Sequence, residues 1–278
     1  MIDIVKIKPV IKWSGSKRSQ SEKIVALMPD EISTYYEPFV GGASVLYQLL
    51  HSGKKVNNYV CSDKNNDLIE LWNVIKNDPD GLSKHYEELW NDLNKDDDVD
   101  RRKEYFYSIR KRFNEEKSPY DFLFLSRTCT NGLIRYNSKG FFNTSLHFSR
   151  KGIVPRTLDG IIQDWSVKLN ENNVQFIQQE YFGVESKEGD FIYLDPPYAG
   201  TKGMYYGTLN YEEFWDWIRK QQGKYLLSFD GKRAEVDNTY AVPNDLYSEH
   251  IYLSSGRSSF KDLKHQVVQK VEESLYIA

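Results

Sequence analysis

The sequence predicts an α/β fold in which a mainly helical segment interrupts the sheet. In the first 75 residues a glycine turn opens a helical pattern, and an apolar strand that ends in an acid precedes a second helical pattern. Strand-like stretches return only after residue 173, and the residues between show no alternation of strand and helix. We therefore expect a core of residues 1–75 and 166–278 and an insert of residues 76–165.

Each element follows from a local pattern. Val45, Leu46, Leu49 and Leu50 follow Gly41-Gly42 with helical spacing, so a helix is expected there. β-branched and apolar residues predict the strands, and turn residues separate them. The remaining predicted elements are a strand at 56–62, a helix at 67–75, helices up to residue 130, turns at 137–140, and strands at 174–177, 191–194, 225–229 and 274–277.

The composition of the 278 residues excludes several classes of protein. Hydrophobic residues make up 40% and charged residues 28%, which is typical of a globular chain and not of a disordered one. Apolar runs fall short of the roughly 18 residues that span a bilayer, and no basic and apolar leader opens the chain. We expect a soluble, cytoplasmic protein without a membrane partner. Cys61 and Cys129 lack a CxxC spacing and the histidines are scattered, so we expect neither disulfides nor a metal.

The charge is distributed unevenly along the chain. The formal net charge is -3, yet residues 101–156 contain thirteen Lys or Arg and four acids, a local charge of +9, which leaves -12 for the rest. A basic middle segment in an acidic protein suits a module that follows a phosphate backbone. A solvated helical face would show the same charge.

Residues 37–44, EPFVGGAS, form a glycine loop before the first predicted helix. Glycines allow backbone amides at such a turn to approach a ligand closely, although many such turns are only tight connections. The next strand ends about twenty residues on at Asp63, where an acid can accept hydrogen bonds from both hydroxyls of a ribose. The loop lacks the GxGxxG pattern and no Walker lysine follows, so we expect a smaller nucleoside cofactor, S-adenosylmethionine.

The sequence Asp195-Pro196-Pro197-Tyr198 directly follows the predicted strand 191–194. It therefore lies at the carboxyl end of a strand, the edge at which α/β sheets bind ligands. Two prolines restrict the backbone, so a carbonyl, a carboxylate and an aromatic ring are presented rigidly. The carbonyl and the carboxylate can accept hydrogen bonds from an exocyclic amine. The aromatic ring of Tyr198 can stack on the base that carries this amine. A proline turn with a surface acid is the structural alternative.

Together these motifs resemble the DNA adenine-N6 methyltransferase family related to the Dam methylase, and the resemblance covers most of the chain. It includes KWSGSK at 12–17, the glycine loop, Ser62-Asp63, residues 126–143 and DPPY at 195–198. The resemblance implies a Rossmann-like S-adenosylmethionine-dependent methyltransferase core with a target-recognition insert. It implies cofactor binding by Trp13, Lys17, Phe39, Gly41, Asp63 and Asp195, and a catalytic motif of Asp195, Pro196, Pro197 and Tyr198.

The stretch 126–137, SRTCTNGLIRYN, resembles the DNA-binding segment of that family and lies within the basic region. The resemblance implies DNA contacts by Lys12, Arg127, Asn131, Leu133, Arg135 and Asn137. Among these, Arg135 suits a bidentate bond to guanine and Leu133 a thymine methyl group. Thr130 stands where the family commonly has an aromatic residue, and Thr144-Ser145 replace Val-Pro. We expect recognition of GATC, although the sequence departs from the family at these two places.

We therefore expect an enzyme that flips adenine out of duplex DNA and methylates its N6 atom, in a role such as restriction–modification. We expect a monomer that has no obligate protein partner. N4-methylation of cytosine and N6-methylation of RNA adenine would use the same core. A catalytically silent DNA-binding protein is an alternative of another class, against which the intact DPPY and the glycine loop paired with Asp63 argue.

Overall fold

The computed structural model describes residues 7–197, 209–233, 236–237, 239, 241–257 and 270–278, so Tyr198 lies outside the described residues. Two compact units account for the described chain. The first contains Ile7, Lys17–Ser62 and the described part of Gln179–Ala278, and the second contains Lys8–Ser16 and Asp63–Gln178. The second unit is wider than the expected insert of residues 76–165 and includes a segment that precedes Lys17.

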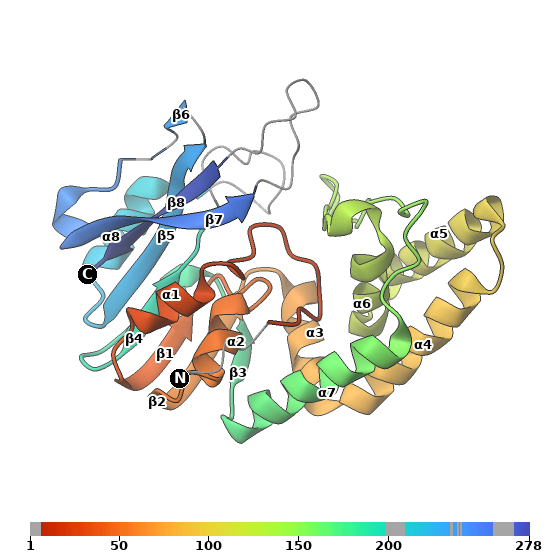
Figure 1. Cartoon of the computed structure of the whole chain (residues 1–278), viewed down its shortest axis with the longest axis horizontal. Helices are drawn as coiled ribbons and strands as arrows, with labels where there is room; N and C mark the ends of the chain where they lie inside the picture. Colours follow the sequence, from red (N-terminus) through yellow and green to blue (C-terminus); the bar gives the residue numbers. More distant parts are fainter. Residues whose placement is uncertain (1–6, 198–208, 234–235, 238, 240, 258–269) are drawn as a thin grey trace. The chain divides into compact units, whose positions relative to one another are not determined.

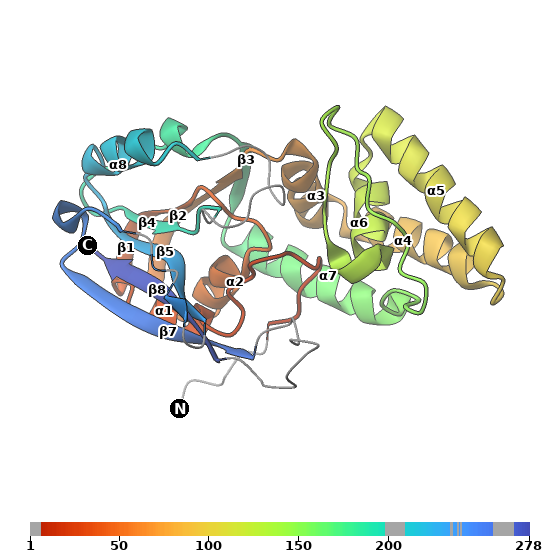
Figure 2. The ribbon, with the colours of Figure 1, turned by 90° about the horizontal axis from the view of Figure 1, so that it is seen from above.

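The first unit is built on a mixed sheet. Its elements are α1 (Ser21–Ala26), β1 (Glu31–Glu37), α2 (Ser44–Leu50), β2 (Lys55–Asp63), η2 (Tyr181–Gly183), β4 (Phe191–Leu194), α8 (Tyr211–Arg219), β5 (Lys224–Arg233), β6 (Val236–Asp237), η3 (Asn244–Leu246), β7 (Glu249–Arg257) and β8 (Lys270–Ile277). Within this unit the strands are ordered β2-β1-β4-β5-β8-β7, and β6 pairs with β5. The helix α8 lies on one face of the strands, and α1 and α2 lie on the other (Figure 1 and Figure 2).

The pairing of the strands sets which chain ends meet. β1 is parallel to β2 and β4, and β4 is parallel to β5, whereas β8 is antiparallel to both β5 and β7. In register, Tyr36 lies opposite Ile192, and Ile192 lies opposite Tyr225. The carboxyl ends of β1, β4 and β5 therefore lie along one edge of the sheet, which is the Rossmann-like arrangement that the sequence predicts.

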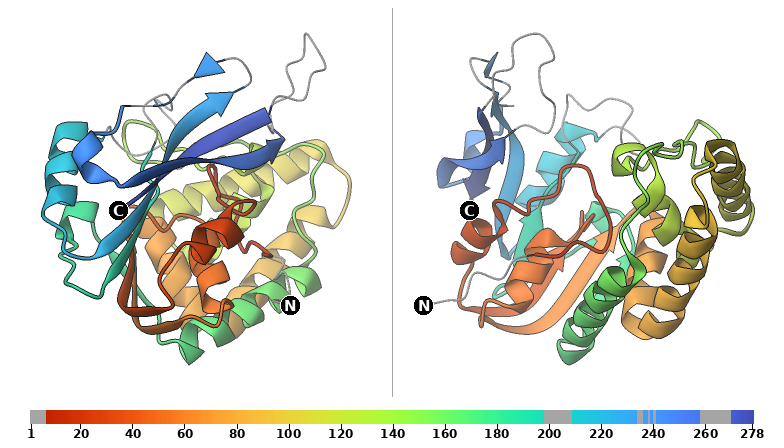
Figure 3. Two further views of the ribbon diagram at one scale, coloured as in Figure 1. Left: turned by 60° about the vertical axis from the view of Figure 1, so that its left-hand side comes forward. Right: turned by 45° about the vertical axis from the view of Figure 1, so that its right-hand side comes forward.

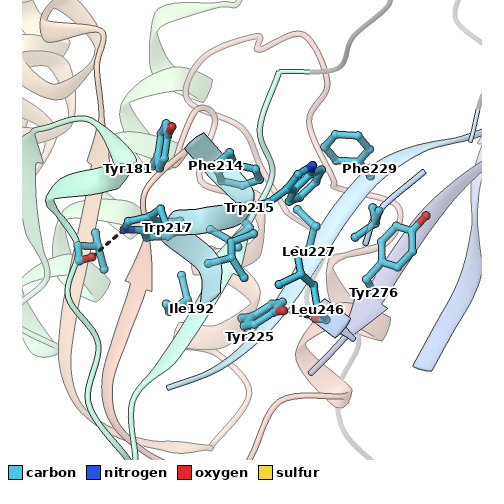
Figure 4. Close-up of a cluster of buried hydrophobic side chains, with 14 residues drawn as sticks. Tyr181, Ile192, Phe214, Trp215, Trp217, Tyr225, Leu227, Phe229, Leu246 and Tyr276 are labelled. Atoms are coloured by element: carbon cyan, nitrogen blue, oxygen red, sulfur yellow. Dashed lines mark hydrogen bonds between the residues drawn. The ribbon is translucent and has the colours of Figure 1, made fainter. Parts of the chain in front are cut away.

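All four side chains of β4 are buried, as expected for a central parallel strand. An aromatic cluster fills the space beside it (Figure 4). Phe214 and Trp217 of α8 stack at a centroid distance of 5.8 Å, and the Trp217 indole donates a hydrogen bond of 3.0 Å to the Val184 carbonyl. This bond satisfies the one polar group of a large buried ring, so the cluster anchors α8 to the segment before β4.

The second unit is mainly helical, as predicted. It contains α3 (Asn66–Asn77), α4 (Pro79–Asn94), α5 (Val99–Glu116), α6 (Pro119–Thr128), η1 (Thr130–Gly132), α7 (Pro155–Glu171) and the short strand β3 (Gln175–Gln178). Figure 3 shows α4 and α7 side by side, in agreement with their contacts. Proline occupies the first turn of α4, α6 and α7, where its missing N–H costs nothing.

The boundaries of the units follow from side-chain packing that crosses the expected limits. Trp72 of α3 and Trp165 of α7 meet at a centroid distance of 4.8 Å, and Trp72 also stacks on Phe176 of β3 at 5.5 Å. The Trp165 indole donates a hydrogen bond of 3.1 Å to the Lys8 carbonyl. These contacts hold α3, α7, β3 and the segment at Lys8 together in one unit, although they lie far apart in the sequence.

The sequence patterns missed several elements. The prediction contains no strand at β1 or β7 and no helix at α1, and it leaves the segment that forms α8 as helix or loop. Residue 165, where the expected insert ends, lies within α7. β1, EISTYYE, has neither an apolar run nor a strict alternation of polar and apolar residues, so only its pairing with β2 and β4 identifies it as a strand. Among the described helices, none has the length and apolar content that crossing a membrane requires.

Candidate active site

A buried ion pair joins Lys17 to Asp195 in the first unit. Lys17 Nζ lies 2.7 Å from Oδ1 and 2.8 Å from Oδ2 of Asp195, and 3.4 Å from Oε2 of Glu273. The lysine side chain is 4% exposed, whereas Asp195 and Glu273 are 20% and 21% exposed. Asp195 directly follows β4 and Glu273 lies on β8. One buried cation therefore holds two carboxylates that come from different strands.

The surroundings of Lys17 keep its ammonium group charged. Burial lowers the pKa of this lysine, but the carboxylates of Asp195 and Glu273 outweigh burial, and the pKa of Lys17 is raised overall. The charge of Lys17 in turn lies against both oxygens of the Asp195 carboxylate. Because each carboxylate oxygen has two lone pairs, Asp195 retains acceptor capacity after binding Lys17.

Glu37 is a second carboxyl group of this sheet edge. It is 3% exposed at the end of β1, and the Tyr35 hydroxyl donates a hydrogen bond of 2.9 Å to its Oε2 atom. Burial is the largest influence and raises the pKa of Glu37 to about 8, the Tyr35 hydrogen bond opposes the rise, and the charge of Asp195 adds to it. Glu37 is therefore mostly protonated at neutral pH, which avoids a second negative charge beside Asp195.

Hydrogen bonds fix the strand that leads into Asp195. The Tyr193 hydroxyl and Ser228 Oγ lie 2.8 Å apart, which links the buried faces of β4 and β5. Pro196 is buried, and the Pro197 carbonyl accepts a hydrogen bond of 3.5 Å from Tyr211. The catalytic motif expected from the sequence is thus held on both sides of Asp195. Its last member, Tyr198, lies outside the described residues.

The glycine loop closes between β1 and α2. Val40 N–H donates to the Ser62 carbonyl at 3.0 Å, which connects the loop to the end of β2. Gly41 and Ala43 have φ angles of 46° and 52°, in the left-handed region that glycine adopts readily. The Phe39 ring stacks on Tyr181 at a centroid distance of 5.8 Å. The loop is therefore a defined turn whose conformation depends on Gly41.

The expected cofactor residues divide between the two units. Lys17, Phe39, Gly41 and Asp195 belong to the first unit, and the structure brings Lys17 and Asp195 into direct contact. Trp13 and Asp63 belong to the second unit. Each is partly exposed, and Asp63 Oδ1 accepts a hydrogen bond of 2.9 Å from the Asn65 N–H.

The expected DNA-contacting residues gather on one part of the second unit. Asn131, Arg135 and Asn137 are exposed, and Leu133 is partly exposed. Arg135 and Asn137 lie on a short hairpin whose strands meet at a bridge between Tyr136 and Phe142. Thr130, which replaces an aromatic residue in the resemblance, directs its hydroxyl to the carbonyls of Ser145 at 3.1 Å and Leu146 at 3.2 Å.

Lys12 packs against the segment that precedes this hairpin. A Cβ atom added at Gly132, whose φ is +67°, would lie 2.5 Å from the Cβ of Lys12. Burial lowers the pKa of Lys12, and the charges of Arg150 and Arg127 lower it further. Arg127 is 8% exposed and donates a hydrogen bond to the Pro9 carbonyl. Arg127 therefore holds the segment that carries Lys12, a role that the sequence did not predict, and its DNA contact stays a prediction.

The sequence prediction missed Glu37 and Glu273 as residues of the candidate active site. The signal for Glu37 was its place as the first residue of the glycine loop 37–44, whereas its position at the carboxyl end of β1 became visible only in the structure. Glu273 had none, because its approach to Lys17 depends on β8 pairing antiparallel with β5.

Comparison with known proteins identifies the chain. Residues 13–269 match the family described as D12 class N6 adenine-specific DNA methyltransferase. The chain belongs to this family. Over 258 residues, or 86% of each chain, the methyltransferase is 32% identical to the type II methyltransferase M.MjaIII of Methanocaldococcus jannaschii. It is 30% identical over 200 residues to the DNA adenine methylase of Serratia marcescens, which covers 70% of this chain and 68% of that one.

These matches confirm that the protein is an adenine-specific DNA methyltransferase, as the sequence predicts. The candidate alternatives of cytosine methylation and silent DNA binding fall outside this family description. The buried Lys17–Asp195 pair thus belongs to an enzyme that transfers a methyl group to DNA, and membership of the family implies a methyl donor.

Proposed function

We propose that this methyltransferase transfers the methyl group of S-adenosylmethionine to the N6 atom of an adenine that is flipped out of duplex DNA, within GATC. The observation that carries the proposal is the buried ion pair of Lys17 with Asp195 at the carboxyl end of β4. It supports a reacting centre because a rigid, ionised acceptor lies where α/β sheets bind ligands.

The residues of the first unit fit S-adenosylmethionine chemically. The carboxylates of Asp195 and Glu273 suit a ligand that carries a positive sulfonium, and the Gly41 turn lets backbone approach it. Phe39 adds an aromatic surface that is partly exposed. When bound, S-adenosylmethionine supplies an electrophilic methyl group. We propose Trp13, Lys17, Phe39, Gly41, Asp63 and Asp195 as the residues that hold it.

Asp195 acts on the attacking amine in this proposal. Its carboxylate oxygens accept hydrogen bonds from the N6 hydrogens, and its negative charge stabilises the positive charge that develops on N6 during direct displacement. Lys17 keeps Asp195 ionised and fixes the orientation of both carboxylate oxygens. Pro196 and Pro197 hold the backbone after Asp195, and we propose that the Tyr198 ring stacks on the adenine.

The second unit supplies the DNA-binding part of the proposal. Its basic segment, residues 101–156, suits the phosphate backbone, and exposed Arg135 suits the guanine of GATC. Asn131 and Asn137 are exposed for further polar contacts. Leu133 is partly exposed, as contact with a thymine methyl group requires.

A methylation assay tests the proposal. The purified protein is incubated with S-adenosylmethionine and with three substrates, a duplex with one GATC, the same duplex scrambled at that site, and an RNA with the corresponding sequence GAUC. Nucleosides released by digestion are then identified by mass spectrometry. We expect N6-methyldeoxyadenosine from the GATC duplex alone. Equal methylation of the scrambled duplex would overturn the GATC assignment, and absence of transfer from S-adenosylmethionine would overturn the assigned donor.

A further inference from the structure

The hairpin of the second unit has a defined register. Asn137 N–H donates to the Phe141 carbonyl at 2.9 Å, and Asn143 N–H donates to the Arg135 carbonyl at 3.0 Å. These two bonds flank the antiparallel bridge between Tyr136 and Phe142. Asn137 therefore lies opposite Phe141, and Arg135 lies opposite Asn143.

The register separates the hairpin side chains into two faces. Phe142 is 1% exposed, and its ring contacts those of Tyr136 and Phe113 at centroid distances of 6.0 Å each. Because successive side chains of a strand alternate, the neighbours of Tyr136 and Phe142 point to the other face. This second face, which we name the recognition face, consists of Arg135, Asn137, Phe141 and Asn143, all exposed.

Phe141 is the apolar member of the recognition face and is 45% exposed. It lies directly opposite Asn137 and diagonally from Arg135, within the roughly 7–8 Å at which diagonal neighbours interact. Lys139 is exposed in the connecting turn. In proteins that bind nucleic acids, aromatic rings commonly stack on bases while neighbouring cationic side chains contact phosphates. The recognition face and Lys139 combine both kinds of group.

The backbone beneath Phe141 is held from two sides. Asn137 Oδ1 accepts hydrogen bonds from the N–H groups of Lys139 at 2.9 Å and Phe141 at 3.1 Å, which closes the turn. On the other side, the Asn114 side chain accepts from Phe142 N–H at 2.8 Å and donates to the Phe142 carbonyl at 3.1 Å. The exposed ring is therefore carried on a braced turn, which lowers the entropy cost of placing it in a ligand.

The α5 helix reinforces this bracing along one of its faces. Arg110 donates to the carbonyls of Asn143 and Thr144 at 3.2 Å each, and Lys117 donates to the Gly140 carbonyl at 3.3 Å. Arg110 and Asn114 are four positions apart and lie on the same side of α5, and Lys117 is the residue that follows the helix. Part of the basic charge of this segment thus positions the hairpin.

We infer that Phe141 inserts its ring into the base stack of the duplex, beside the base pair that Arg135 contacts. The inference rests on the proposed function, because it requires DNA on the recognition face. Insertion of an apolar side chain partly unstacks a base step and bends the duplex, and the exposed, braced ring of Phe141 is suited to this. Phe141 then contributes to DNA affinity and to the distortion that precedes base flipping, without contacting the methyl donor.

Phe148 provides a matched control. Its ring is 63% exposed in the same unit, but the Lys103 ammonium lies over it at 5.5 Å from the centroid, and its carbonyl accepts a bond of 3.4 Å from Arg102. It is not part of the recognition face. Phe141→Ala and Phe148→Ala remove rings of comparable exposure, and neither removes a buried side chain, so both variants are expected to fold.

The test uses GATC duplexes that carry 2-aminopurine at successive positions, because this base fluoresces more strongly when it is unstacked. With the full-length wild-type protein we expect a fluorescence increase at the base step next to the guanine contacted by Arg135. Phe141→Ala should abolish that increase and weaken duplex binding about 5- to 150-fold, the range expected for one aromatic stacking contact. Phe141→Tyr should restore both, and Phe148→Ala should leave both unchanged.

The outcomes separate this inference from the proposed function. Wild-type methylation of the duplex, together with an unchanged Phe141→Ala variant, would overturn the insertion of Phe141 alone. A loss in Phe148→Ala equal to that in Phe141→Ala would also overturn it, because any exposed aromatic residue would then suffice. A wild-type protein that binds no duplex would overturn the insertion and the proposed function together.

Discussion

Lys17 Nζ lies within 2.8 Å of both carboxylate oxygens of Asp195, although 178 positions separate the two residues in the chain. Lys17 is buried and Asp195 keeps one-fifth of its side chain exposed. The pair therefore combines a fixed charge with access from solvent.

Replacing Asp195 with Asn should abolish most methyl transfer and spare DNA binding. The variant loses the negative charge that stabilises the developing cation on N6, and loss of one such electrostatic contact lowers turnover by about 10²–10³-fold. Single-turnover methylation and duplex affinity are the measurements. Asp216→Asn, at a carboxylate that is 68% exposed, is the control and should retain activity. Near-normal single-turnover transfer in Asp195→Asn would remove Asp195 from the reacting centre.

A double-mutant cycle on Lys17 and Asp195 should reveal strong coupling. Each single variant leaves a charge without its nearest partner, whereas Lys17→Met combined with Asp195→Ala removes both, so the double variant should lose less stability than the sum of the singles. We expect a coupling free energy of unfolding of about 0.5–3 kcal/mol, measured by urea denaturation.

The pair of Lys55 with Glu31 is the control for that cycle. Its atoms are also 2.8 Å apart, but its side chains are 78% and 75% exposed, so solvent screens the charges. The same cycle there should give less than about 1 kcal/mol. Equal coupling in both pairs would show that burial does not strengthen the contact between Lys17 and Asp195.

Glu37→Gln should change how stability depends on pH. The pKa of Glu37 is about 8 in the folded protein and near 4.5 in the unfolded chain, so the unfolded carboxyl loses its proton first. The wild type therefore loses stability, relative to the variant, as pH rises from about 4.5 to 8. Urea midpoints of both proteins at pH 5, 6.5 and 8 measure this difference. A difference that stays constant with pH would mean that Glu37 is ionised when folded.

Arg135→Ala should relax sequence discrimination, whereas Lys139→Ala should weaken binding to all duplexes alike. A bidentate arginine contributes about 1–3 kcal/mol of discrimination at one base pair, whereas a lysine on phosphate acts through counterion release and changes the salt slope by about one. Binding to GATC and scrambled duplexes is measured at several salt concentrations. Equal losses on both duplexes for Arg135→Ala would make Arg135 a phosphate contact.

Gly132→Ala should destabilise the second unit. The residue has a positive φ, and its new Cβ would lie 2.5 Å from the Lys12 Cβ, close to the backbone where Lys12 cannot simply rotate away. We expect a loss of about 1–3 kcal/mol and weaker DNA binding through displacement of Lys12. Gly160→Ala is the control, since a Cβ there meets nothing within 4 Å and the residue lies inside α7, so stability should rise by about 0.5–1 kcal/mol. Thermal denaturation of both variants and of the wild type measures these changes in stability.

Local sequence determined the parts of this protein that depend on neighbouring residues. The apolar run before Asp195 specifies β4, the glycines at 41 and 42 specify the loop, and the periodicity of residues 76–130 specifies helices. The motifs also sufficed to identify the family, because they report on chemistry that requires particular residue types at short spacings. β1 escaped prediction because its sequence, EISTYYE, has neither an apolar run nor a strict alternation.

Only the tertiary structure decided the contacts that depend on strand order and burial. It brought Glu273 of β8 to Lys17, raised the pKa of Glu37 by burying it, and placed Arg127 where it donates a hydrogen bond to the Pro9 carbonyl. It also put Phe141 on the same face of the hairpin as Arg135 through one antiparallel bridge. Phe141 and Arg135 are close in sequence, and the register of the turn between them sets their common face. The other three outcomes depend on residues far apart in the sequence, whose distances are set by packing of the whole unit, whereas sequence patterns record only the preferences of adjacent residues.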